Sequence, residues 1–169
     1  MFEKKKYITV IFYVISGFVF LTLIPFYQED FSPEVIIGVF LLVWGNDSMA
    51  YLIGKNFGRR KLLERISPKK TVEGFLGGIL GAIIAAFVIF SYTDLPLWVW
   101  LGLAVVASIF GTIGDLIQSK FKRQAGVKDS GTLMPGHGGL YDRLDSIMYA
   151  SPFLYAFLLI VAYVSQGGI

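Results

Sequence analysis

The apolar run LWVWLGLAVVASIFGTIGDLI (Leu97–Ile117) is followed almost at once by the polar run SKFKRQAGVKDSGTLMPGHGGLYDRLD (Ser119–Asp145). The first run is long enough to cross a bilayer, which takes roughly 20 apolar residues. The second is rich in charge and glycine, and it leads into another apolar run, Leu144–Val164. Ionisable groups so close to hydrocarbon are costly unless they are paired, hydrated or metal-bound. The sequence therefore predicts a membrane protein with a functional polar segment at one membrane face.

Five segments are long enough to span a membrane in this chain of 169 residues, of which 55% are hydrophobic. They lie at Tyr7–Phe26, Glu34–Ile53, Gly74–Tyr92, Leu97–Ile117 and Leu144–Val164. The predicted fold is an all-α polytopic membrane bundle of about five transmembrane helices, forming a single domain over residues 1–169. The first segment follows three lysines and has no small-residue cleavage site after it, so we expect an uncleaved anchor.

Small residues and aromatic residues refine this picture. Gly77, Gly78, Gly81 and Ala82 in the third span would permit close helix packing. Trp98 and Trp100, near the start of the fourth span, fit an interfacial aromatic belt. The chain has no cysteine, which excludes disulfides, thiolate metal ligands and a cysteine nucleophile.

Charge is distributed unequally between the two sides of this topology. With five crossings, all 15 Lys and Arg residues fall on the side of the N-terminus and of the segments 54–72 and 118–143. The loops of the other side carry only acidic charges. The positive-inside rule makes the basic side cytoplasmic. We expect an integral protein of the inner (cytoplasmic) membrane with both polar segments in the cytoplasm, and no nucleic-acid partner.

Four aspartates converge at the basic side. Asp47 lies within the second span and Asp115 near the end of the fourth, while Asp142 and Asp145 are three residues apart and share a helical face. Such carboxylates would repel one another, and a divalent cation would relieve the repulsion. Ligands that offer only oxygen favour Mg²⁺ or a similar hard ion, and a second cation stays open. Helix capping by Asp142 and Asp145, or salt bridges from Asp47 and Asp115 to a basic residue, are the alternatives.

Cations and hydroxyls flank these carboxylates. Lys122, Arg123 and Lys128 lie in the second polar segment, and the run Ser67-Pro68-Lys69-Lys70-Thr71 precedes the third span. Cations, hydroxyls and backbone N–H groups at a helix start suit a polyphosphate. The alternative is that the basic side chains extend toward anionic headgroups, which suffices for Arg59, Arg60 and Lys61.

Glycines surround the only histidine, His137, in the run Pro135–Gly139. They permit positive φ values and a close approach of the backbone to a ligand. Metal, polyphosphate and membrane interface together predict phosphoryl or nucleotidyl transfer to a lipid, which needs positioning and charge neutralisation more than a protein nucleophile. A lipid phosphate acceptor needs no strong base, whereas a lipid hydroxyl would need one, for which Asp129 or Asp47 are candidates.

The same residues resemble the characteristic pattern of the phosphatidate cytidylyltransferases, or CDP-diacylglycerol synthases. The pattern reads here as Ser119, Lys122-Arg123, Lys128-Asp129-Ser130-Gly131, Pro135-Gly136-His137-Gly138-Gly139 and Asp142-Arg143-Leu144-Asp145. Two shorter blocks also match: Asn46-Asp47-Ser48 with Gly54-Lys55, and Ser67-Pro68-Lys69-Lys70-Thr71 with Glu73-Gly74. The resemblance runs from about Trp44 onward. Bacterial members carry additional N-terminal helices, so the chain looks like a short form of the family.

The resemblance implies transfer of CMP from CTP to phosphatidate in phospholipid synthesis, with release of pyrophosphate and Mg²⁺ dependence. It implies that Asp115 and Asp142 bind metal, and we add Asp145 and Asp47 as further ligands. Its phosphate-binding residues would be Lys122, Arg123, Lys128 and Lys70, while Asp129 and His137 would shape the nucleotide or acceptor site. We expect further substrate contacts from Ser67, Lys69, Thr71, Ser119 and Arg143. The resemblance also makes a homodimer plausible.

Three other functions stay open at this point. The first is a CDP-archaeol synthase-like enzyme that acts on an ether lipid, and the second is a CTP-dependent lipid kinase, which would release CDP. The third is a cation channel or transporter with aspartates along its pathway. The gathering of charge at one face argues against the third, because a conduction path needs polar groups at the bilayer midplane.

Overall fold

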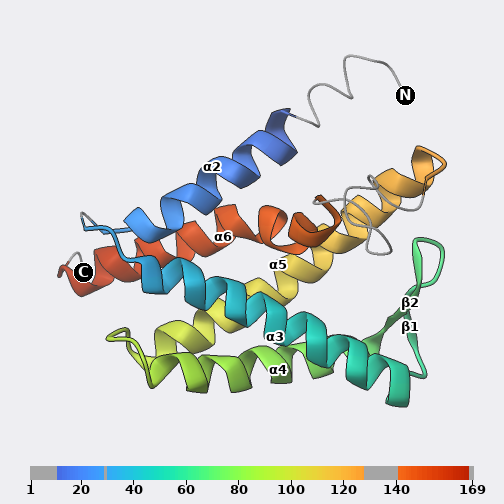
Figure 1. Cartoon of the computed structure of the whole chain (residues 1–169), viewed down its shortest axis with the longest axis horizontal. Coiled ribbons are helices and arrows are strands. Elements are labelled where there is room, and N and C mark those ends of the chain that lie inside the picture. Colours follow the sequence, from blue (N-terminus) through green and yellow to red (C-terminus); the bar gives the residue numbers. More distant parts are fainter. Residues whose placement is uncertain (1–10, 29, 128–140, 168–169) are drawn as a thin grey trace.

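Nine helical and strand elements are described by the computed structural model, which covers residues 11–28, 30–127 and 141–167 (Figure 1). In chain order they are η1 (Ile11–Ile15), α2 (Ser16–Leu23), η2 (Ile24–Phe26), α3 (Pro33–Phe57), β1 (Lys61–Leu63), β2 (Ser67–Thr71), α4 (Val72–Phe90), α5 (Leu97–Gln124) and α6 (Tyr141–Ser165).

Among the described residues, four helices are long and apolar enough to cross a membrane, and they coincide with four of the predicted spans. These are α3, α4, α5 and residues Leu144–Ser165 of α6. A shorter apolar helix covers Phe12–Phe26. The predicted first span begins at Tyr7, outside the described residues, so the fifth crossing stays a prediction. The all-α membrane bundle is confirmed, and the chain is an integral membrane protein.

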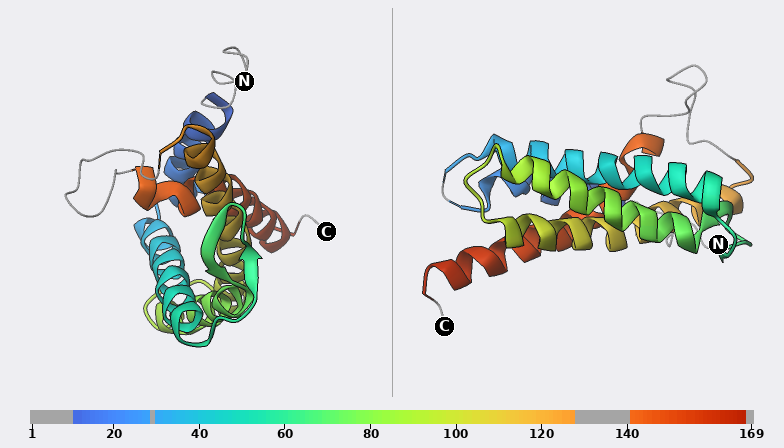
Figure 2. Two further views of the ribbon diagram at one scale, coloured as in Figure 1. Left: turned by 90° about the vertical axis from the view of Figure 1, so that its right-hand side faces the viewer. Right: turned by 90° about the horizontal axis from the view of Figure 1, so that it is seen from below.

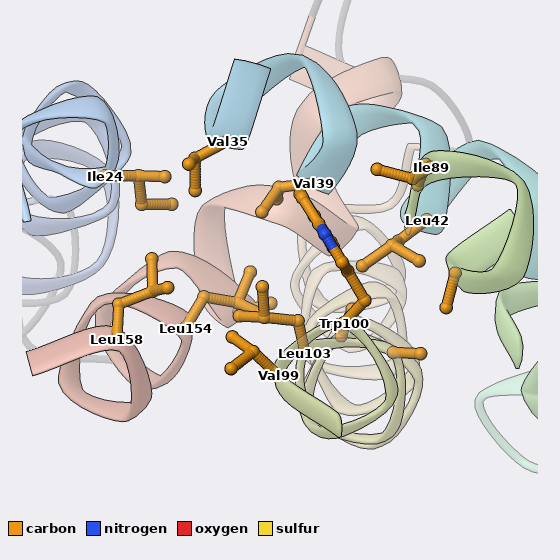
Figure 3. Packing of buried hydrophobic residues seen from close by; sticks show 14 of the residues in the cluster. Ile24, Val35, Val39, Leu42, Ile89, Val99, Trp100, Leu103, Leu154 and Leu158 are labelled. Carbon is orange, nitrogen blue, oxygen red and sulfur yellow. The ribbon is translucent and has the colours of Figure 1, made fainter. Parts of the chain in front are cut away.

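The core lies where α3, α5 and α6 meet, and Figure 3 shows their side chains converging. Trp100 is fully buried there, and its indole Nε1 donates a hydrogen bond to Thr93 Oγ1 at 2.8 Å. Its ring packs so tightly against Gly38 that a Cβ on that glycine would lie 2.3 Å from the ring edge. The predicted anchoring role is therefore wrong for Trp100, whose side chain fills the core, whereas Trp98 is exposed.

Helices α3 and α4 lie side by side along their length, as the views in Figures 1 and 2 agree. The predicted close packing through small residues is confirmed, because Gly77, Gly78 and Gly81 are buried. A Cβ on Gly81 would lie 2.5 Å from the carbonyl oxygen of Gly45. The two backbones can approach this closely only because glycine has no side chain.

Helix α5 continues two turns beyond its predicted end at Ile117. Residues Ser119–Gln124, which the sequence analysis places in a loop, are helical. The helix ends at Gln124, and Gly126, whose φ of 72° suits glycine, follows the C-cap residue and donates its N–H to the Arg123 carbonyl at 3.2 Å. The Val127 N–H donates to the Lys122 carbonyl at 3.0 Å, which completes a Schellman motif. Lys122 and Arg123 in the last turn also favour the helix by opposing its dipole.

The segment between α3 and α4 contains a small antiparallel hairpin that the sequence analysis did not predict. Strands β1 and β2 pair Lys61 with Thr71 and Leu63 with Ser67. In Figure 1 the hairpin lies at the same end of the bundle as the last turns of α5, and the connection 91–96 lies at the other end. The described basic residues all belong to the hairpin end, as the predicted topology requires.

Replacing Gly81 by alanine should destabilise the bundle, because the new methyl group would collide with the α3 backbone. Overpacking of this kind costs about 1–3 kcal/mol. Gly111→Ala is the matched control, since its Cβ would lie 3.5 Å from Ser146 Cβ, an ordinary contact, and gains the same helix propensity. Thermal unfolding in detergent should show a lower midpoint for Gly81→Ala only. Equal midpoints would contradict the proposed packing.

Candidate active site at the basic end of the bundle

A cavity of about 680 Å³ opens at the hairpin end of the bundle and is lined by residues of α3, the hairpin, α4, α5 and α6. The structure brings together here most of the described residues that the sequence predicts for the site. Its charged lining comprises Asp47, Lys55, Lys69, Lys70, Asp115, Lys122, Asp142 and Asp145. Segments that are far apart in sequence thus contribute to one polar site, although the chemical role of each residue stays a prediction.

One face of α5 supplies three polar groups to this site. Asp115, Ser119 and Lys122 follow one another at helical spacing, which the two extra turns of α5 make possible. The Ser119 hydroxyl donates a hydrogen bond to Asp115 Oδ1 at 3.2 Å. The Lys122 ammonium donates to Asp142 Oδ1 at 2.8 Å and so joins α5 to α6. Both partners of this ion pair are largely buried, with 16% and 10% of their side-chain surfaces exposed.

The hairpin supplies a second cation to α5. Lys70, on β2, forms an ion pair with Asp115 Oδ2, and about a quarter of the Lys70 side chain remains exposed. The next residue, Thr71, is buried and caps α4, because its Oγ1 accepts a hydrogen bond from the Gly74 N–H at 3.1 Å. A substrate contact is predicted for Thr71 from the sequence. The structure adds this capping role, which fixes the junction between hairpin and helix.

The four aspartates differ in their surroundings. Asp47 is exposed along the cavity and accepts a hydrogen bond from Asn46 Nδ2 at 3.2 Å. Asp145 is buried and accepts a hydrogen bond from the Ser146 N–H at 2.8 Å. Asp115 lies near enough to both Asp47 and Asp145 to repel them electrostatically. The salt-bridge alternative raised from the sequence is thus observed for Asp115, which pairs with Lys70.

This donor set suits a hard cation in chemistry, because every candidate ligand is an oxygen. Across the described residues, however, no three acidic or histidine side chains converge closely enough to hold one ion. Lys70 and Lys122 instead stand beside two of the carboxylates, at the positions where cations are needed. The residues fit a metal ion when Lys70 moves away from Asp115 and Lys122 moves away from Asp142, so that the ion takes the place of the ammonium groups.

Several predicted residues lie away from the cavity lining or outside the described part. Ser67 and Arg123 are not among the described residues that line the cavity, and Ser119 reaches it through Asp115. The Arg123 side chain is exposed, and its Nη1 is 3.5 Å from the Val127 carbonyl oxygen. Lys128, Asp129 and His137 lie outside the described residues, as does the side chain of Arg143.

Sequence reasoning assigned no site role to Asn46 or to Lys55 and Tyr51. Asn46 is 5% exposed, lines the cavity, and its Oδ1 has no hydrogen-bond partner in the described structure. The Lys55 ammonium lies 5.8 Å from the centre of the Tyr51 ring, at the cavity wall. Their positions relative to Asp47 could have indicated a place at the site. Asn46 immediately precedes Asp47, and Tyr51 and Lys55 follow Asp47 by one and two helical turns.

Comparison with known proteins gives a consistent result. The chain matches the cytidylyltransferase family over residues 1–161. It is 43% identical over 150 residues to a phosphatidate cytidylyltransferase of Staphylococcus aureus (strain COL), and 45% identical over 150 residues to one of Staphylococcus epidermidis. A Staphylococcus saprophyticus relative of the same name is 42% identical over 149 residues. The matches cover 87% of this chain but 56% of each relative, so the chain spans little more than half their length.

Replacing Lys70 by methionine should tighten the binding of Mn²⁺ in the absence of nucleotide by about tenfold or more, because a competing positive charge leaves Asp115. The signal of free Mn²⁺ in electron paramagnetic resonance measures this affinity. Lys61→Met is the matched control, since Lys61 lies on the same hairpin but is exposed and outside the cavity lining. Unchanged or weaker binding in Lys70→Met would show that the ion pair does not compete with a metal.

Proposed function

We propose that this chain, which belongs to the cytidylyltransferase family, transfers CMP from CTP to phosphatidate and releases CDP-diacylglycerol and pyrophosphate. It would thus be a nucleotidyltransferase of phospholipid synthesis. One observation carries the proposal: four carboxylates and four lysines line a single cavity at one end of a membrane bundle. A water-soluble nucleotide and a membrane-bound lipid phosphate can meet only at such an interface.

The proposed reaction is an in-line displacement at the α-phosphorus of CTP. A phosphate oxygen of phosphatidate forms the new P–O bond, and the bond from the α-phosphorus to the bridging oxygen of the β-phosphate breaks. Pyrophosphate leaves with the electron pair. The attacking phosphate is already anionic near neutral pH, so the site needs no strong general base. Lys69, Lys70 and Lys122 would hold phosphate oxygens and neutralise the charge that develops on the leaving group.

Asp115 and Asp142, with Asp47 and Asp145 beside them, would hold Mg²⁺. When bound, the ion supplies charge neutralisation and orientation of phosphate oxygens. The carboxylates have a second function, because they hold the two lysine side chains inside the cavity before any ligand arrives. Lys70 and Lys122 are then within reach of a polyphosphate that enters. Lys128, Asp129 and His137 keep their predicted roles as proposals.

We place the cavity on the cytoplasmic side of the inner membrane, where CTP is available. The gathering of basic residues at the cavity end supports this orientation, because cytoplasmic loops carry an excess of Lys and Arg. The apolar, lipid-facing surfaces of α3 to α6 would let phosphatidate approach from within the bilayer. The homodimer that the resemblance suggests stays a prediction.

The deciding assay is pyrophosphate release by the detergent-purified chain with CTP, Mg²⁺ and phosphatidate, omitting each in turn. We expect release only when all three are present. Release of CDP would identify a lipid kinase instead, and activity with an ether-linked acceptor alone would identify a CDP-archaeol synthase-like enzyme. Ion flux through liposomes without nucleotide would favour a channel. No product with any acceptor would refute the activity for this chain.

Asp142→Asn should reduce turnover by about a hundredfold or more while the protein still folds, because the amide keeps the side chain's size but loses its charge. Asp94→Asn is the matched control, as Asp94 is exposed and belongs to the connection between α4 and α5, which lies at the opposite end of the bundle (Figure 1). Turnover and thermal unfolding are measured on both variants. Near-normal turnover in Asp142→Asn would remove that carboxylate from the proposed metal ligands.

A further inference from the structure

We propose that Glu73 is a positioning residue, whose carboxylate fixes the base of the β1–β2 hairpin and thereby holds Lys69 and Lys70 in the cavity. Glu73 lies in the first turn of α4, just after the hairpin ends at Thr71. The identity of the ligand that the lysines bind rests on the proposed function. The fixing of the hairpin rests on the geometry of Glu73 alone.

The Glu73 carboxylate, which follows β2, binds the backbone just before β1, so it bridges the two chain segments at the base of the hairpin. Its Oε2 accepts hydrogen bonds from the N–H groups of Arg59 and Arg60 at 3.0 and 3.1 Å. Its Oε1 lies 3.6 Å from the Arg60 Nε, but the Arg60 side chain is 83% exposed, so this ion pair contributes little. The two backbone hydrogen bonds, which are charge-assisted, are the stronger part of the contact.

These contacts close the hairpin at its open end. The Val72 N–H donates to the Arg60 carbonyl at 2.9 Å, and Lys61 pairs with Thr71 in the strand register. Gly58 completes the closure, because a Cβ there would lie 2.2 Å from the Gly54 carbonyl oxygen and 2.6 Å from Thr71 Cγ2. The segment that follows α3 therefore packs closely against the segment that precedes α4. The Glu73 carboxylate connects the two segments by its hydrogen bonds.

The hairpin needs such an anchor. A two-stranded hairpin is marginally stable by itself, and β1 has only three residues. Lys70 nevertheless has to reach Asp115 on α5 from this short strand. A hairpin free to move at its base would move the Lys70 ammonium with it, since only two residues, Thr71 and Val72, lie between Lys70 and Glu73. The placement of both hairpin lysines thus depends on the Glu73 carboxylate.

A favourable interaction with the helix dipole is the ordinary reason for a glutamate in a first helical turn. Two observations show that Glu73 does more. The N-cap position of α4 is already filled by Thr71, which accepts from Gly74. Two of the hydrogen bonds that the Glu73 carboxylate accepts come from residues 13 and 14 positions earlier in the chain, outside its own helix.

Three variants separate these roles. Glu73→Ala removes both acceptors and should raise the KM for CTP by about tenfold or more, with a smaller change in kcat, because displaced lysines bind the nucleotide less well. Glu73→Gln keeps an oxygen that can accept from Arg59 and Arg60, so its KM should stay within about threefold of the unaltered chain. Glu64→Gln, on the exposed hairpin tip, should leave all values unchanged.

Hydrogen exchange of the backbone amides provides a readout that does not depend on activity. In Glu73→Ala the amides of residues 59–71 should exchange at least about tenfold faster, while those in the middle of α4 and α5 keep their rates. Unchanged exchange at residues 59–71 would overturn the proposal, as would faster exchange throughout the bundle, which indicates a general loss of stability. If the unaltered chain releases no pyrophosphate, the proposed function fails, and the exchange rates still decide whether Glu73 fixes the hairpin.

Discussion

The ion pair between Lys70 and Asp115 is the contact on which the arrangement of the site depends. Asp115 lies on a helix that crosses the membrane, where a carboxylate without a cation beside it is costly. The cation comes from β2, so the need for charge pairing draws the hairpin over the end of α5. Lys122 and Asp142 join α5 to α6 in the same way. Charge pairing thus connects the hairpin, α5 and α6, three of the elements that line the cavity.

The close approach of α3 and α4 makes this pairing possible. Both helices flank the hairpin, and their separation at that end sets where β1 and β2 begin and end. The buried glycines of α4 let its backbone touch α3, which brings Ala50 and Gly54 against Gly74. The chain consequently leaves α3 and enters α4 at neighbouring points. Glu73 in α4 can therefore bind the backbone of Arg59 and Arg60, which follow α3. Small residues in the membrane therefore determine where a lysine is placed at its surface.

Much of this could be predicted from the sequence, since apolar runs indicate spanning helices and the ends of those runs place Asp47, Asp115, Asp142 and Asp145 at one face. The extension of α5 was missed because hydropathy falls after Ile117, whereas the backbone stays helical until Gly126 permits a left-handed turn. The hairpin was missed because SPKKT shows no alternation of polar and apolar residues. The partner of each lysine depends on tertiary packing, which a pattern of charges along the chain does not contain.

The balance of charge in the cavity bears on how ligands bind there. The formal charges of the four carboxylates and four lysines in the lining cancel, and two of each are already paired. A polyphosphate that entered alone would compete with Asp115 and Asp142 for Lys70 and Lys122, and would leave those carboxylates without cations. A divalent cation that entered alone would displace the lysines and leave them without anions. The two ligands entering together satisfy every group, because each supplies the partner that the other displaces. Under the proposed function, the paired resting state therefore favours binding of the nucleotide and the metal together over binding of either alone.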